Sequence, residues 1–278
     1  MSQMNTVVFT LLAMLAFAGN SLLCRLALKH TAIDPASFTA IRIVAGALTL
    51  WVVVRLRAPT GKSAGNWPSA LALFVYAAAF SYSYVSLPAA SGALLLFGAV
   101  QATMIGYGLW TGVRPGALQT FGLLAAAGGL VALLLPGLSA PPLAGAVLMI
   151  AAGIAWGVYS LRGKDAGDAT RVTAGNFMRA SLLAACLGVG MLSRASLDAE
   201  GALYAIASGA VTSGLGYAVW YTALRGLTAT TSASVQLSVP VITAAGGVAL
   251  LGEPLTLRLV ACSIVILGGI AVVIAGKK

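Results

Sequence analysis

The sequence predicts an all-α integral membrane protein. We expect ten transmembrane helices, arranged as two inverted five-helix repeats around a central cavity, with the N- and C-termini in the cytoplasm. Apolar residues make up 60% of the chain, charged residues only 8%, and the mean hydropathy is +0.98, so the chain cannot cover a water-facing surface. Apolar runs of about 20 residues, enough to cross ~30 Å of hydrocarbon, follow one another along the chain. Several motifs also recur about 140 residues apart.

Short breaks separate the expected spans. Proline stands at several of them, as in Asp34-Pro35 and Leu87-Pro88, and proline is favoured at helix starts because its missing N–H would be unpaired there. The spans are expected at 6–28, 34–56, 66–86, 88–110, 116–135, 142–162, 172–193, 200–222, 229–250 and 256–275.

Cationic residues near the loops set the expected orientation, because cytoplasmic loops carry an excess of Lys and Arg. With the N-terminus inside, four fall on the outer side: Arg25, Lys29, Arg194 and Arg258. The inner side holds ten: Arg55, Arg57, Lys62, Arg114, Arg162, Lys164, Arg171, Arg225, Lys277 and Lys278. Both termini are therefore expected in the cytoplasm.

The recurring motifs divide the chain into halves at 1–138 and 139–278. LLAAAGGLVALLLPG (123–137) resembles IVILGGIAVVIAG (264–276), and Arg42 is followed 137 residues later by Arg179. Five spans is an odd number, so the second copy must enter the membrane from the opposite side. Inverted repeats of this kind occur in many secondary transporters, with the substrate site between the halves. The Gly-Gly spans carry almost no polar residues, so we expect them to be scaffold helices outside the bundle.

Four features carry a resemblance to a known family: Trp156-Gly157, the two span arginines, Gly-Glu-Pro at 252–254 and the repeated Gly-Gly. The chain resembles the drug/metabolite transporter superfamily, in its ten-helix EamA type, and is most similar to the YddG-type aromatic amino acid exporters. The first copy departs from the pattern with Ala18-Gly19 and with Val113-Arg114 in place of Gly-Glu. The resemblance implies multi-pass insertion in a bacterial inner membrane and export of small metabolites.

Polar and aromatic side chains within spans are candidates for a substrate site, because such groups are costly in lipid. Rings offer apolar faces and amides offer donors and acceptors, which suits an aromatic or other neutral amino acid, or a flat organic cation or drug. Helix-packing hydrogen bonds and interfacial anchoring are the alternatives. Tyr82 lies off the stripe that Tyr76 begins. The candidates are Asn20, Phe80, Tyr82, Tyr84, Phe97, Gln101, Trp156, Tyr159, Asn176, Tyr217, Trp220 and Gln236.

Arg42 and Arg179 each stand about eight residues into a span. Either could bind a substrate carboxylate by paired hydrogen bonds. Either could instead reach the headgroups or the carbonyls of a neighbouring helix. Both copies keep an arginine although a substrate needs only one, so a structural role is favoured.

Titratable groups are placed away from the middle of the spans. The acids all lie in or beside loops: Asp34, Asp165, Asp168, Asp198, Glu200 and Glu253. The sole histidine, His30, lies at a helix end. A proton relay needs a titratable site within the barrier, so we expect facilitative or weakly coupled transport by alternating access.

Other functions fit the sequence less well. Loop-only acids and one histidine leave no catalytic set, and Cys24, Cys186 and Cys262 have no metal spacing, so we expect no enzyme, cofactor or metal. The cations sit between apolar runs rather than in a nucleic-acid patch. A nucleotide-sugar or phosphorylated-metabolite transporter of the same fold, a lipid scramblase and a channel remain alternatives. Expected partners are a small-molecule substrate and membrane lipids, with the protein a monomer.

Overall fold

A computed structural model describes residues 3–56, 65–112, 114–135, 140–163, 168–227, 232 and 235–276. The elements within these ranges are all helical. They are α1 (Gln3–His30), α2 (Pro35–Leu56), α3 (Trp67–Tyr84), α4 (Ala89–Trp110), α5 (Ala117–Leu134), α6 (Leu143–Gly163), α7 (Ala169–Gly190), η1 (Leu192–Arg194), α8 (Ala199–Ala207), η2 (Ser208–Leu215), α9 (Gly216–Leu224), α11 (Ser238–Leu251) and α12 (Leu257–Ala275).

Eight helices of the described chain are long and apolar enough to cross a membrane. They are α1, α2, α4, α5, α6, α7, the continuous run Ala199–Leu224 and α12. Helix α11 is apolar but has 14 residues, and α3 has tyrosine and serine in its last turn. The predicted class of multi-pass helical membrane protein is confirmed, while the predicted start of the span at 229–250 lies partly outside the described residues.

Local sequence signals explain several helix starts. Asn66 precedes α3 and its side-chain oxygen accepts a hydrogen bond from the Ser69 N–H at 2.9 Å. Asp168 and Thr256 cap α7 and α12 in the same way. Such caps satisfy N–H groups that have no partner within the helix.

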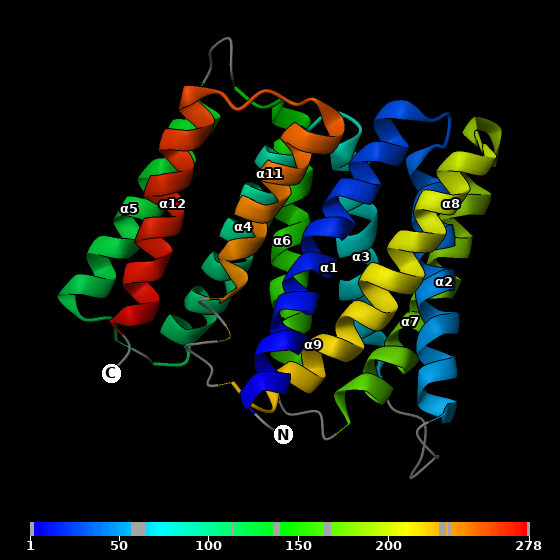
Figure 1. The fold of residues 1–278 in the computed structure, drawn as a ribbon, viewed down its shortest axis with the longest axis horizontal. Coiled ribbons are helices and arrows are strands. Elements are labelled where there is room, and N and C mark those ends of the chain that lie inside the picture. Colours follow the sequence, from blue (N-terminus) through cyan, green and yellow to red (C-terminus); the bar gives the residue numbers. More distant parts are fainter. Residues whose placement is uncertain are drawn as a thin grey trace.

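The helices run side by side in one bundle, with the marked N- and C-terminal ends of the chain at the same end of it (Figure 1). Every major contact between the sequence halves has a counterpart. Helix α3 packs on α6 as α8 and α9 pack on α1, and α4 packs on α6 as α11 packs on α1. The pairs α2–α7, α4–α11 and α5–α12 join corresponding helices directly.

Helices α5 and α12, which carry the two Gly-Gly motifs, form a pair at one edge of the bundle (Figure 1). A Cβ atom on Gly269 would lie 2.6 Å from the carbonyl oxygen of Gly122, and one on Gly122 would lie equally close to the oxygen of Gly269. Gly128 and Gly268 have open space around them. One glycine of α12's pair therefore permits backbone contact, while the other faces away from it.

A carboxylate in the loop before α2 links two distant segments. Asp34 accepts hydrogen bonds from the Ala36 and Ser37 N–H groups at the start of α2, and from the Ser196 N–H between η1 and α8. Partial desolvation pushes the pKa of Asp34 up, but these hydrogen bonds outweigh it and hold the pKa below its ordinary value. The linkage is therefore strongest when this carboxylate is ionised.

The α5–α12 contact predicts unequal effects from two adjacent substitutions. G269A should lower stability by about 1–3 kcal/mol, because the new methyl group must push the two backbones apart. G268A should be neutral or stabilising by about 0.5–1 kcal/mol, since alanine is the better helix former and nothing opposes its methyl group. Unfolding of both variants in detergent would be compared with the wild type, and equal stabilities would contradict the packing described.

Candidate functional site

A cavity lies in the middle of the bundle, between α1, α3, α4, α6, η2 and α9. Most of its lining is aromatic: Phe17, Tyr76, Phe80, Phe97, Trp156 and Tyr217. Asn20, Ser21, Leu96 and Thr212 complete it. This central cavity thus has an apolar, aromatic wall with a small number of polar groups, the usual composition of a small-molecule site.

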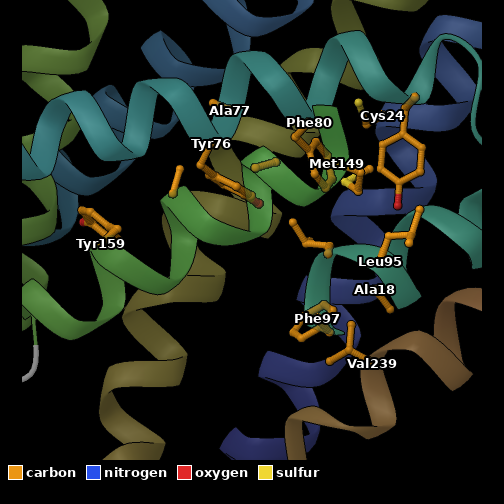
Figure 2. Packing of buried hydrophobic residues seen from close by; sticks show 14 of the residues in the cluster. Ala18, Cys24, Tyr76, Ala77, Phe80, Leu95, Phe97, Met149, Tyr159 and Val239 are labelled. Atoms are coloured by element: carbon orange, nitrogen blue, oxygen red, sulfur yellow. The ribbon is translucent and has the colours of Figure 1, made fainter. Parts of the chain in front are cut away.

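The rings of the central cavity contact one another from both halves of the sequence. Trp156 lies 4.8 Å from Tyr76 and 5.0 Å from Tyr217, between ring centroids. Figure 2 shows Tyr76 and Phe80 on α3, and Phe97 on α4 near Ala18 and Val239. Tilted and edge-to-face contacts at such distances add to the stability that ring burial provides.

Asn20 is the centre of a buried polar network. Its amide nitrogen donates to the Tyr76 hydroxyl at 3.2 Å. Its amide oxygen accepts hydrogen bonds from Ser208 at 2.7 Å and Thr212 at 3.2 Å. Both amide atoms are therefore engaged with the protein, and the side chain is fixed in orientation.

Ser208 and Thr212 belong to η2, a π-helical segment within the longer run Ala199–Leu224. Gly209 in this segment lies directly on the α2 backbone at Arg42, where a Cβ atom would collide with the arginine carbonyl. The wider winding of η2 and its small residues allow close contact with α2 and α1. π-helical turns occur frequently at functional sites.

Arg42 is buried beside the central cavity. Its guanidinium carbon lies 4.8 Å from the centre of the Phe80 ring and 5.3 Å from that of Tyr76. Nη2 donates to the Tyr76 hydroxyl at 3.1 Å and Nε to Ser213 at 3.4 Å, while the buried Nη1 has no hydrogen-bond partner among the described residues. The positive charge is stabilised mainly by ring faces and hydroxyl groups.

Arg179, the repeat counterpart of Arg42, has a different environment. It is half-buried on α7 and donates to the Gly175 carbonyl of its own helix at 2.9 Å. This hydrogen bond within its own helix suits a structural role. The two arginines are therefore alike in sequence position but unlike in surroundings.

A second, smaller cavity lies where α3, α6, α7 and α9 meet. We call it the end cavity, and its polar lining is Ser69, Tyr159, Arg162, Thr173, Asn176 and Tyr221. The Tyr159 hydroxyl donates to Thr173 and accepts from Asn176, and Thr173 donates to Tyr221. Arg162 donates to Ser69 at 3.1 Å and to Asn66 at 3.4 Å.

A buried ion pair closes the opposite end of the bundle. Arg25 Nε donates to Glu253 Oε1 at 2.9 Å, and the side chains are only 10% and 6% exposed. Arg25 also donates to the carbonyls of Tyr84 and Val85 at the end of α3. Glu253 Oε2 accepts from the N–H of Ala89 at the start of α4. Glu253 thus lies in a loop, as predicted, but is buried and holds α1, α3 and α4 to the α11–α12 connection.

The predicted site residues divide between the central cavity, the end cavity and positions outside both. The central cavity contains Asn20, Phe80, Phe97, Trp156 and Tyr217. The end cavity contains Tyr159 and Asn176. The remaining candidates lie outside the linings of these two cavities: Tyr82, Tyr84, Gln101, Trp220 and Gln236.

Sequence reasoning missed part of the central lining. Phe17 and Tyr76 were visible as neighbours of Asn20 and Phe80 at helical spacing, and this spacing was the signal that could have included them. Ser21, Leu96 and Thr212 carry no such signal, because small polar and aliphatic residues occur throughout the spans. Gln236 instead donates to the Ser232 carbonyl one turn away.

The central cavity measures about 20 Å³ and the end cavity about 10 Å³, which is room for a water molecule or two. An amino acid would need the surrounding helices to separate. An internal, aromatic cavity with a few polar groups, in a multi-pass helical protein, is the kind of site that a membrane transporter for small molecules needs.

Comparisons with known proteins identify the family. Residues 143–275 match the model of the EamA-like transporter family. The chain is 57% identical to the uncharacterized protein PA1977 of Pseudomonas aeruginosa, over all of this chain and 97% of that protein. The chain therefore belongs to the EamA-like transporter family.

A solved structure described as "Crystal structure of protein" superposes with a TM-score of 0.70 over 100% of both chains, at 18% identity. This likeness shows a shared fold.

The polar network predicts a stability difference between two tyrosines of α3. Y76F removes the oxygen that accepts from Asn20 and Arg42, so it should leave two buried donors unpaired and lower stability by about 1–3 kcal/mol for each. Y82F alters a half-exposed tyrosine outside both cavity linings and should change stability by less than about 0.5 kcal/mol. Thermal unfolding in detergent measures both, and a Y76F protein as stable as Y82F would refute the network.

Proposed function

We propose that this protein is a secondary carrier that exports small amphipathic metabolites across the bacterial inner membrane. Aromatic and other neutral amino acids are the expected substrates, and drugs of similar shape are a further group. The observation that carries the proposal is the central cavity, in which six aromatic rings and one oriented amide face a common space. Ring faces would hold an aromatic side chain, and the polar groups would orient it.

The proposed architecture has ten spans in two inverted repeats, 1–138 and 139–278, with cytoplasmic termini. The reciprocal helix contacts support it, because each major contact between the halves has a counterpart in which the corresponding helices are exchanged. The two ends of the chain lie at one end of the bundle (Figure 1), as an even number of spans requires. The excess of loop cations at that end supports its cytoplasmic location.

We further propose alternating access between the two ends of the bundle. The Arg25–Glu253 ion pair joins the elements that close one end. In the proposed orientation this is the outer end, and the end cavity is at the cytoplasmic end. Substrate would enter past the end cavity, and export would require the ion pair to separate.

The proposed transport is facilitative or weakly coupled. The described residues that line the central cavity include no carboxylate and no histidine. The buried carboxylate Glu253 is held by Arg25 and by a backbone N–H, away from this lining. A group of this kind in direct contact with the substrate space would instead favour proton coupling.

Proteoliposome uptake of labelled phenylalanine tests the proposal. Wild-type protein should give saturable uptake that an imposed pH gradient does not change. W156A should lower uptake at least tenfold, since Trp156 contacts rings from both halves, on the scale of ~1.4 kcal/mol per tenfold. W110A removes an exposed ring outside the cavity and should leave uptake unchanged.

Two results would overturn parts of this account. Accumulation driven by the pH gradient would exclude facilitative transport. Equal losses in W156A and W110A would show that the central cavity is not where the aromatic substrate binds.

A Q236A variant should take up phenylalanine as the wild type does, because Gln236 lies outside both cavity linings.

A further inference from the structure

Two arginines hold corresponding positions in the halves of the chain. Arg25 lies near the end of α1, and Arg162, 137 residues later, lies near the end of α6. This offset is the same as that between Arg42 and Arg179. Each arginine is next to the start or end of α3, at opposite ends of the bundle. The surroundings of these two arginines can therefore be compared.

The settings differ by a carboxylate. Arg25 is paired with Glu253 of the Gly-Glu-Pro turn. The corresponding turn of the first half has Val113-Arg114 in place of Gly-Glu, so its sequence provides no carboxylate there. Among the residues that the structure describes, Arg162 has no carboxylate partner and donates only to the neutral oxygens of Ser69 and Asn66. Its positive charge remains available to an anion.

A cavity is present beside the arginine that lacks the acid. Arg162 lines the end cavity with Tyr159, Thr173 and Tyr221, whose hydroxyl groups form a hydrogen-bonded chain. A guanidinium next to hydroxyl and amide groups is a good receptor for a carboxylate, because an ionic hydrogen bond is stronger than a neutral one.

We propose that the end cavity, when the helices around it separate, is a second substrate site, in which Arg162 binds the carboxylate of an aromatic carboxylic or amino acid. The substrate carboxylate would then pair with Arg162 at this end, as Glu253 pairs with Arg25 at the other. The inference rests on the proposed transport function and adds a substrate class to it. An aromatic compound without a carboxylate would lack this contact.

The two cavities are neighbours along α6. Tyr159 lines the end cavity and Trp156, one turn earlier, lines the central cavity. Their rings are stacked, with centroids 5.4 Å apart and planes at 28°. This ring pair lies between the two sites. The aromatic group of a substrate bound to Arg162 would therefore lie beside the two rings that the substrate must pass to reach the central cavity.

The test is equilibrium binding to the purified full chain in detergent. The probes are phenylacetate and phenylacetamide, which share the ring and differ in charge. Wild-type protein should bind phenylacetate about tenfold more tightly, the size expected for one hydrogen bond to a charged group. R162Q should abolish this preference, so that the two probes bind with about equal affinity. R179Q, which removes the charge of an arginine outside both cavities, should keep the wild-type preference.

R162K decides the matter if R162Q does not fold, since it keeps the positive charge. It should retain a preference of several-fold for phenylacetate. The proposal is overturned if the wild type binds both probes equally, or if R179Q loses the preference for phenylacetate as R162Q does. It is also overturned if folded R162Q keeps this preference or folded R162K loses it.

Proteoliposome uptake of labelled phenylalanine separates this inference from the transport function. Uptake without an Arg162-dependent carboxylate preference would remove the second site and leave the carrier. An Arg162-dependent preference without uptake would establish the carboxylate site and overturn the transport function.

Discussion

The ion pair between Arg25 and Glu253 is the constraint on which one end of the bundle depends. A charged side chain removed from water is strongly unfavourable unless an opposite charge and further hydrogen bonds compensate it. Here each partner makes further hydrogen bonds. Arg25 donates to two carbonyls at the end of α3, and Glu253 accepts from the N–H of Ala89. Separating the pair would expose several unsatisfied groups at once, so these elements either stay together or part as a unit.

The other end of the bundle, around Arg162, has no such ion pair among the residues that the structure describes. Arg162 contacts neutral groups, and a cavity remains beside it. In the proposed inverted repeat the two ends would be equivalent, but they differ in two ways: the first half has Val113-Arg114 in place of Gly-Glu, and Arg162 is exposed whereas Arg25 is buried. We therefore propose that the closed structure has a direction, with one end held by the Arg25–Glu253 ion pair and the other available to a substrate.

Helix positions were predictable from the sequence because length and proline placement set them. Pro35 begins α2, and the predicted span 142–162 corresponds to Leu143–Gly163. The paired glycines were predicted to belong to scaffold helices, and they lie in the α5–α12 pair at the edge of the bundle. The close contact between Gly122 and Gly269 depends on how the helices are rotated, which a wholly apolar sequence does not specify.

The site was predictable only in part for the same reason. Tyr76, Phe80 and Tyr84 form one stripe, yet only Tyr76 and Phe80 line the central cavity. Arg42 and Arg179 are equivalent by sequence, and the neighbours supplied by other helices make one buried and the other half-buried. The burial of Glu253 also required knowledge of Arg25, more than two hundred residues away along the chain.

The most direct test of the account is the accessibility of the central cavity from each side of the membrane. In a protein without Cys24, Cys186 and Cys262, S21C would place a single thiol in the cavity lining. Membrane-impermeant thiol reagents would be applied to right-side-out and inside-out vesicles, with wild-type Glu253 and with E253Q. The account predicts that, with Glu253, labelling is faster from the Arg162 end than from the Arg25 end, and that E253Q raises the rate of labelling from the Arg25 end. Labelling that is equally fast from both ends while Glu253 is intact, or an unchanged pattern in folded E253Q protein, would contradict it.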